Sequence, residues 1–304
     1  MQNLLQEIID TNKEFYKDGS IADYIPALKN ADIKNCGISV IDKDKTIYSA
    51  GDFDKKFTIQ SISKVIALMQ AIIDKGEEEV FKIVGYEGSE KSFNAISYLG
   101  EESTNQAINP MMNSGAIAVT SLVKGQGEEK FDRILNLVRS LAGNPEIDFN
   151  TEVYLSEKAT GDRNRAICYL MKSKEILKGD PEDILDNYFK QCSIEVDTRD
   201  LANIAFSIGN RFKDIELPKD VDKKLLSRLL IAIMTHSGMY NFSGQWSVKV
   251  GIASKSGVAG GILSVVPDEY GIGFFGPSLD KHGNPLVGYK VLKELSKRLD
   301  LNRY

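Results

Sequence analysis

The chain has 304 residues, of which 42% are hydrophobic and 27% are charged, a composition typical of a globular protein that buries a full-sized core. Its formal net charge is −5, and because no long basic block is present, we expect no nucleic-acid partner. No segment approaches the ~20 consecutive apolar residues of a membrane span, so we expect no membrane association.

The cysteines and the N-terminus indicate the cellular compartment. There are three cysteines, widely spaced and odd in number: Cys36, Cys168 and Cys192. This pattern fits a reducing compartment and argues against a disulfide framework or a structural zinc site. Residues 1–15 carry several charges and lack the apolar core of a signal peptide. We therefore predict a cytoplasmic protein that holds no metal.

The N-terminal part of the chain predicts helix, hairpin and helix in turn. Apolar residues recur at helical spacing from Leu4 to Phe15, and Gly19 would end that helix. Residues 22–26 form a short loop. Two strand-like runs, 37–41 and 46–49, predict a β-hairpin, after which an apolar run turns into a helix that begins at Ser61.

The rest of the chain is first helical and then strand-like. Helical periodicity is found at residues 131–141, 165–177, 184–191, 198–208 and 223–234. Strand-like runs separated by Gly and Pro follow at residues 248–250, 253–257, 261–266 and 270–275, and a last helix is expected at 285–299.

This order of elements predicts an α+β fold. Both chain ends would build one antiparallel sheet flanked by helices, with a mainly helical subdomain inserted between them. We expect residues 1–304 to form a single catalytic unit. Residues 1–76 and 235–304 would make its sheet-containing subdomain, and 77–234 its helical subdomain.

Ser61-Ile62-Ser63-Lys64 carries a Ser-x-x-Lys spacing. Residues three apart share one face of a helix, so Lys64 could take the proton of the Ser61 hydroxyl if the pKa of the lysine were depressed. The alternative is a serine cap followed by a solvated lysine. Apolar neighbours surround the motif, however, which predicts a buried helix, and a buried lysine requires a reason.

Two other features of the sequence do not indicate a functional site. Residues 271–276 match Gly-x-Gly-x-x-Gly, but Pro277 follows and no helix begins there, so a dinucleotide site is not expected. His236 and His282 are the only histidines and are far apart in the sequence. We therefore expect neither a Ser-His-Asp triad nor a histidine-rich metal site. A lysine base is therefore the natural candidate.

Six segments in register give the sequence a specific resemblance. Besides Gln60-Ser61-Ile62-Ser63-Lys64, they are Ala22-Asp23-Tyr24-Ile25-Pro26, Asn109 to Ala116, Ser156 to Ala166, Tyr188 to Ser193, and Lys255 to Gly261. In order and spacing the chain resembles, over nearly its whole length, the serine-dependent glutaminases of the β-lactamase and penicillin-binding-protein superfamily. Ser114 stands where that family usually has alanine. The resemblance implies a β-lactamase/transpeptidase-like fold.

The resemblance also implies site residues. Ser61 is similar to the nucleophile, Lys64 to the general base, and Tyr240 to a tyrosine that shuttles a proton and contacts the substrate. Lys255 resembles the lysine of the Lys-Ser/Thr-Gly edge strand, and the backbone N–H of Val258 resembles the second oxyanion donor beside that of Ser61. The substrate-binding positions are matched by Tyr24, Asn113, Glu157, Asn164 and Tyr188.

The implied activity is hydrolysis of L-glutamine to L-glutamate and ammonia through a glutamyl ester of Ser61, without a cofactor. Glutamine carries an α-ammonium that needs a carboxylate, which Glu157 would supply, and an α-carboxylate that needs neutral donors, which the Asn and Tyr residues would supply. Repulsion from Lys255 would lower the pKa of Lys64, and both lysines would lower the pKa of Tyr240. The resemblance further implies a homo-oligomer, a dimer or tetramer.

Other interpretations remain open at this stage. Glu157 could be a solvated loop charge, Asn113 a helix cap, and Tyr188 and Tyr240 interior aromatics. The protein could also hydrolyse β-lactams or D-Ala peptides, although the lack of a signal peptide speaks against this. A third possibility is a catalytically idle amino-acid sensor in which Ser61 binds but is not acylated.

Overall fold

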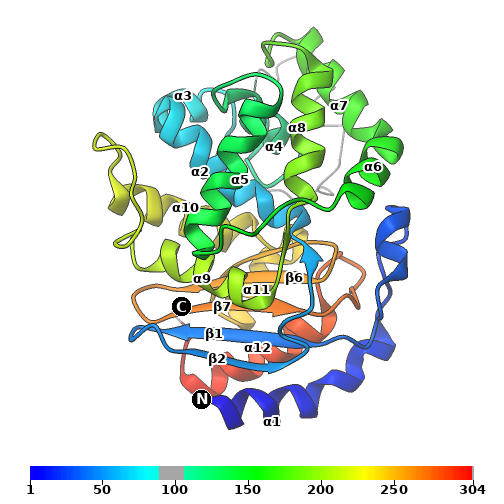
Figure 1. The fold of residues 1–304 in the computed structure, drawn as a ribbon, viewed down its shortest axis with the longest axis vertical. Coiled ribbons are helices and arrows are strands. Elements are labelled where there is room, and N and C mark those ends of the chain that lie inside the picture. Colours follow the sequence, from blue (N-terminus) through cyan, green and yellow to red (C-terminus); the bar gives the residue numbers. More distant parts are fainter. Residues whose placement is uncertain (89–105, 303–304) are drawn as a thin grey trace.

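The structure, a computed structural model, describes residues 1–88 and 106–302 (Figure 1). Its central feature is a five-stranded antiparallel sheet in the order β2-β1-β7-β6-β5. The strands are β1 (Gly37–Asp42), β2 (Ile47–Gly51), β5 (Ala253–Ser256), β6 (Gly261–Val266) and β7 (Tyr270–Phe275). Strands from both chain ends therefore form one sheet, and the predicted α+β fold is confirmed.

Two helices from opposite chain ends cover one face of the sheet. They are α1 (Gln2–Asn12) and α12 (Leu286–Leu299). Ile38, Phe274 and Ile262 stand opposite one another on three neighbouring strands and pack in the same core cluster as these helices. Because side chains alternate along a strand, the next residue, Leu263, points to the other face and joins the core of the helical part.

That other face is covered by α9 (Thr198–Gly209), which lies directly on β7. A Cβ at Gly271 would lie 2.2 Å from the Ala202 carbonyl oxygen, and one at Gly273 would lie 2.1 Å from that of Thr198. The first two glycines of the Gly-x-Gly-x-x-Gly match therefore allow a helix to approach the sheet closely, which gives them a packing role.

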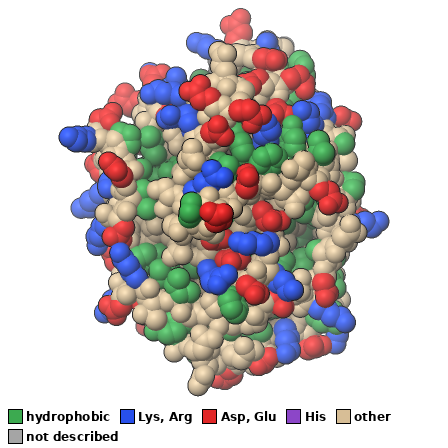
Figure 2. All heavy atoms as spheres, viewed as in Figure 1, with side chains coloured by type: hydrophobic (Ala, Val, Ile, Leu, Met, Phe, Trp, Pro, Cys, Tyr) green, Lys and Arg blue, Asp and Glu red, His purple; other side chains and the backbone are tan. Residues whose placement is uncertain are grey.

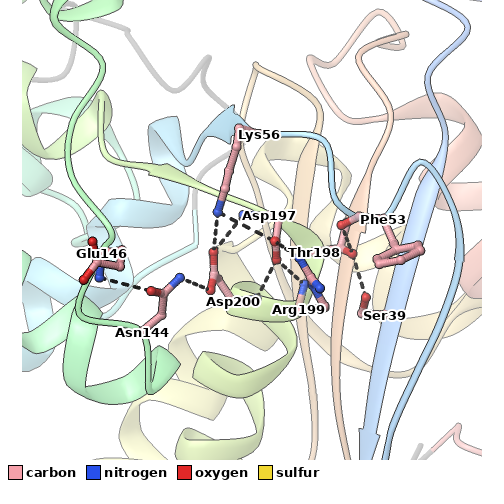
Figure 3. Close-up of polar contacts among 9 residues, drawn as sticks. All are labelled: Ser39, Phe53, Lys56, Asn144, Glu146, Asp197, Thr198, Arg199 and Asp200. Atoms are coloured by element: carbon pink, nitrogen blue, oxygen red, sulfur yellow. Dashed lines mark hydrogen bonds and ion pairs between the residues drawn. The ribbon is translucent and has the colours of Figure 1, made fainter.

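The start of α9 is fixed by a polar cluster (Figure 3). The Asp197 carboxylate accepts the backbone N–H groups of Arg199 and Asp200, and the Asp200 carboxylate accepts that of Asp197, which makes a capping box. Lys56 lies 3.6 Å and 3.2 Å from the two carboxylates. Lys56 thus connects the start of α9 to the segment that leads into the Ser61 turn. The next two residues of that segment form β3 (Phe57–Thr58), which pairs with β4 (Glu195–Val196) just before α9.

The helical part lies above the sheet in Figure 1. Its elements are α2 (Ser63–Lys75), α3 (Glu77–Phe81), α4 (Asn113–Leu122), α5 (Glu128–Ala142), α6 (Thr151–Thr160), α7 (Asp162–Ser173), α8 (Pro181–Cys192) and α10 (Lys223–Ser237). Helix α2 runs through its core, since Val65, Leu68 and Met69 are fully buried. The sequence had not singled out α4 and α6 as helices.

Two local predictions are wrong. Residues 248–250, expected as a strand, instead end the short helix α11 (Ser243–Lys249), because three alternating residues are too few to distinguish a strand from a helix with one exposed side. Val248 is 75% exposed while Trp246 is buried and donates to the Ile252 carbonyl at 2.9 Å. The helix expected to begin at Ser61 begins at Ser63, and Ser61 lies in a 3-10 turn (Gln60–Ile62).

The surface agrees with the mild net charge. Acidic and basic side chains are interspersed over the face shown in Figure 2. Within the described ranges, none of the helices combines the length and the apolar character needed to cross a membrane.

Candidate active site

A cavity of about 250 Å³ lies where the sheet meets the helical part. Its walls include every predicted substrate-binding residue except Tyr240: Tyr24, Ser61, Asn113, Glu157, Asn164, Tyr188 and Val258. Tyr24 is 53% exposed and stands at the mouth, whereas Tyr188 is buried. The other three predicted site residues, Lys64, Tyr240 and Lys255, do not line the cavity but lie buried.

The turn that carries Ser61 has an unusual backbone. Gln60 adopts φ +48°, in the left-handed region that a non-glycine residue occupies at a cost of roughly 1–3 kcal/mol. The end of β5 packs tightly beneath this turn, because a Cβ at Gly257 would lie 2.4 Å from the Ile59 carbonyl oxygen. Ser61 and Val258, which follow these two segments, both line the cavity.

Lys64 is completely buried on α2. Its ammonium donates to the Met111 carbonyl at 3.1 Å and to Asn113 Oδ1 at 2.7 Å. Burial lowers its pKa to about 8, although Cys192 and Glu157 act in the opposite direction. The pKa of Lys64 is lowered, as expected from the sequence, but the largest cause is loss of hydration and not repulsion from Lys255.

Lys255 points from β5 towards the same buried region, since it stands opposite Leu263 in the sheet register. Its ammonium donates to the carbonyls of Gly238 at 2.9 Å and Ser256 at 2.6 Å. Burial, followed by repulsion from Lys64, holds the pKa of Lys255 well below its usual value. The repulsion between the two ammonium groups is mutual, so each lysine disfavours protonation of the other.

Tyr240 lies in a 3-10 turn (Tyr240–Phe242) with φ +55°, a second strained backbone beside the first. Its hydroxyl donates to the Ser256 carbonyl at 3.4 Å and is also hydrogen-bonded to Ser61. Lys255 Nζ lies 4.2 Å from the centre of its ring. Burial raises the pKa of Tyr240 to about 12, so the expectation of a lowered pKa is wrong and the phenol is neutral, since burial disfavours phenolate.

Glu157 extends from α6 and is only 8% exposed, so it is not a solvated loop charge. Burial raises its pKa to about 7, against a hydrogen bond from Gln60 and the charge of Lys64. Asn113 and Asn164 also line the cavity, and Asn113 Nδ2 donates to Asn164 Oδ1 at 2.9 Å. The residues that line the cavity thus include one carboxylate, Glu157, one guanidinium, Arg163, and several neutral amides and hydroxyls.

Sequence reasoning did not assign six residues that line this cavity: Ile25, Gln60, Thr160, Gly161, Arg163 and Cys192. Gln60 could have been found from its position beside the nucleophile motif. Cys192 follows Tyr188 by one helical turn on α8, so the two share a face. Burial raises the pKa of the Cys192 thiol to about 12, which keeps the thiol protonated and therefore poorly nucleophilic.

Among the described residues, no group of three or more histidine, cysteine or acidic side chains is placed to hold a metal ion. An antiparallel sheet built from both chain ends, with a Ser-x-x-Lys turn between that sheet and a helical part, defines a protein of the β-lactamase-like class.

Comparisons with known proteins narrow this class. The glutaminase family model matches residues 19–304. A glutaminase from Clostridioides difficile strain 630 is 50% identical over 302 residues, covering 99% of this chain and 98% of that protein. Glutaminase 2 from Clostridium perfringens strain 13 is 48% identical over 306 residues, covering 99% of each chain. The chain therefore belongs to the glutaminase family and is an amidohydrolase.

The solved structures agree. A probable glutaminase from Bacillus subtilis complexed with 6-diazo-5-oxo-L-norleucine superposes with a TM-score of 0.88 at 33% identity, covering 100% of this chain and 96% of that one. The protein Mglu in its glutamate form has a TM-score of 0.92 at 32% identity and is covered to 69%.

Proposed function

We propose that the chain hydrolyses L-glutamine to L-glutamate and ammonia through a glutamyl ester of Ser61, with Lys64 as the general base. The observation that carries this proposal is a cavity-lining serine followed three residues later by a buried lysine whose pKa is lowered to about 8. A base with that pKa is partly neutral at neutral pH and can accept the serine proton.

Recognition of the substrate follows from the cavity walls. The α-ammonium of glutamine would pair with Glu157, and that contact would in turn favour the ionised carboxylate. The α-carboxylate would accept hydrogen bonds from the side chains of Tyr24, Asn164 and Tyr188. Asn113 would serve two purposes, since one end of its amide holds Lys64 and the other holds Asn164.

In the acylation step, neutral Lys64 takes the proton of Ser61 and the serine oxygen attacks the side-chain amide carbon. The N–H groups of Ser61 and Val258 hold the oxyanion, each worth roughly 2.7–4 kcal/mol by analogy with other oxyanion donors. Tyr240 gives a proton to the departing nitrogen, which leaves as ammonia, and receives one from protonated Lys64. Water then attacks the ester with Lys64 as base, and glutamate leaves as Ser61 regains its proton.

A relative supports the covalent step. The Bacillus subtilis glutaminase forms a covalent complex with 5-oxo-L-norleucine by reaction with 6-diazo-5-oxo-L-norleucine, and it superposes on this chain with a TM-score of 0.88. Because the cavity is lined from both the sheet part and the helical part, we also propose that residues 1–304 act as a single catalytic unit. The homo-oligomeric state and the cytoplasmic location stay predictions.

The proposal is tested by ammonia release and by intact-mass spectrometry. The wild type should release ammonia from glutamine, discriminate against asparagine and peptide amides, and gain one 5-oxo-norleucyl group on reaction with 6-diazo-5-oxo-L-norleucine. Ser61→Ala should lose both activities and Lys64→Ala should lose turnover. Ser63→Ala is the matched control, because Ser63 is buried two residues away and contacts Cys192; it should keep the adduct.

Three results would contradict the proposal. Adduct formation in Ser61→Ala would remove Ser61 as nucleophile. Turnover of nitrocefin in place of glutamine would favour the β-lactam alternative. Binding of glutamine without ammonia release would favour an amino-acid sensor.

A further inference from the structure

Asn284 is a completely buried polar residue outside the cavity, just before α12. Its side chain joins two segments of the chain. Asn284 Oδ1 accepts a hydrogen bond from the Ser256 hydroxyl at 2.6 Å, and Asn284 Nδ2 donates to the Met239 carbonyl at 3.3 Å. A buried amide that meets both partners fixes the distance between the segments that carry them.

Both segments hold Tyr240. Met239 is the residue immediately before it, and the Ser256 carbonyl accepts the Tyr240 hydroxyl. The Ser256 side chain faces the α12 side of the sheet, because it stands opposite Ile262. Asn284 can therefore bind the Ser256 hydroxyl from one side while the Ser256 carbonyl receives Tyr240 and Lys255.

Asn284 is itself held rigidly. The Asp280 carboxylate accepts the backbone N–H groups of Asn284 at 3.0 Å and His282 at 2.8 Å, and the Asp280 N–H donates to the Asn284 carbonyl at 2.8 Å. Gly283 adopts φ +86° in the middle of this turn, a conformation that suits glycine. The turn thus presents the Asn284 amide to Met239 and Ser256 in one orientation.

The backbone of Tyr240 requires such support. Its left-handed φ persists only where the surrounding structure determines it. Within the turn, the Ser243 hydroxyl binds the Tyr240 carbonyl at 2.7 Å and Phe242 N–H binds the Met239 carbonyl at 3.1 Å. The bond from Asn284 anchors this turn to β5, which carries the acceptor of the Tyr240 hydroxyl.

We propose that Asn284 is a positioning residue for Tyr240: its amide clamps Met239 to Ser256 and so keeps the tyrosine hydroxyl aligned with Ser61. This inference rests on the function proposed above, in which Tyr240 transfers a proton to the leaving nitrogen. Asn284 does not line the cavity, so it would act through Tyr240 and not by contact with the substrate.

The test is a double-mutant cycle of Asn284→Ala with Tyr240→Phe. Alone, Asn284→Ala should lower kcat for glutamine about tenfold or more while KM changes less than about threefold, because a contact used in the transition state is misaligned. In the Tyr240→Phe background the same change should cost less than about threefold, since the aligned hydroxyl is already gone.

Asn12→Ala is the matched control. Asn12 is also a buried asparagine that joins two segments, donating to the Ile8 carbonyl at 2.9 Å and to Glu294 on α12 at 2.6 Å. It should lower the melting temperature without altering kcat. If Asn284→Ala does not fold, Ser256→Ala replaces it, because it deletes the donor to Asn284 and carries the same expectation.

Two results would overturn the inference. An unchanged kcat with a melting temperature lowered as in Asn12→Ala would make Asn284 purely structural. Full additivity with Tyr240→Phe would show that it acts elsewhere. Failure of the wild type to form the 5-oxo-norleucyl adduct at Ser61 is a separate outcome, which would overturn the mechanism and this inference with it.

Discussion

The lowered pKa of Lys64 can be tested with the substitution Asn113→Asp, which places a negative charge beside the lysine. With a pKa of about 8 in place of 10.5, about one lysine in eleven is neutral at pH 7 instead of about one in three thousand. Burial therefore supplies roughly a 300-fold gain in available base. Asn113 Oδ1 lies 2.7 Å from the Lys64 ammonium, so aspartate would set a carboxylate against it without changing the shape of the side chain.

The expected effect has a definite sign. A carboxylate within a few ångströms favours the protonated lysine and should raise the pKa of Lys64 by about 1 to 3. Because the base must be neutral, kcat/KM at pH 7 should fall about ten- to thousandfold and recover as the pH rises. In the wild type, kcat/KM should rise through about pH 7, as Glu157 ionises, and level off above about pH 8.

The assay is ammonia release from glutamine across the pH range. Asn113→Ala is the control, because it removes the same hydrogen bonds to Lys64 and Asn164 without adding charge. It should lower activity at every pH and leave the rise where the wild type has it. If Asn113→Asp shows no displacement of that rise to higher pH, Lys64 is not the base that limits the reaction.

Three further changes test other parts of the molecule. Glu157→Gln should lower kcat/KM for glutamine by an amount equivalent to several kcal/mol, because the substrate ammonium loses its charged partner. An unchanged kcat/KM would show that Glu157 does not contact the substrate. Tyr240→Phe should greatly lower kcat with little change in melting temperature, and the reverse pattern would make the hydroxyl structural. Asp197→Ala should lower the free energy of unfolding by about 1–2 kcal/mol through loss of the α9 cap (Figure 3). Asp197→Ser should keep most of that stability, with kcat equal in the two variants. If calorimetry shows the same loss of stability in both variants, the capping argument is refuted.

Short-range patterns predicted the elements that depend on neighbours in the sequence. The hairpin of β1 and β2 and the helices α5, α8, α9 and α10 follow from period-two and helical recurrence of apolar residues. The predictions failed where few residues carried the pattern. Residues 248–250 gave only three alternating positions, and the turn at Gln60, with its positive φ, shifted the start of α2 from Ser61 to Ser63.

The sequence by itself determined the family, the fold class and the chemical types of the candidate site, because motifs in register specify which residues recur together. The cause of the Lys64 pKa shift and the direction of the Tyr240 pKa shift were decided by the tertiary structure. Lys64 meets Asn113, and Tyr240 meets Ser256 and Ser61, only after distant segments fold together. Exclusion of water by those segments is what lowers the pKa of Lys64 and raises that of Tyr240, and burial of this kind cannot be read from spacing along the chain.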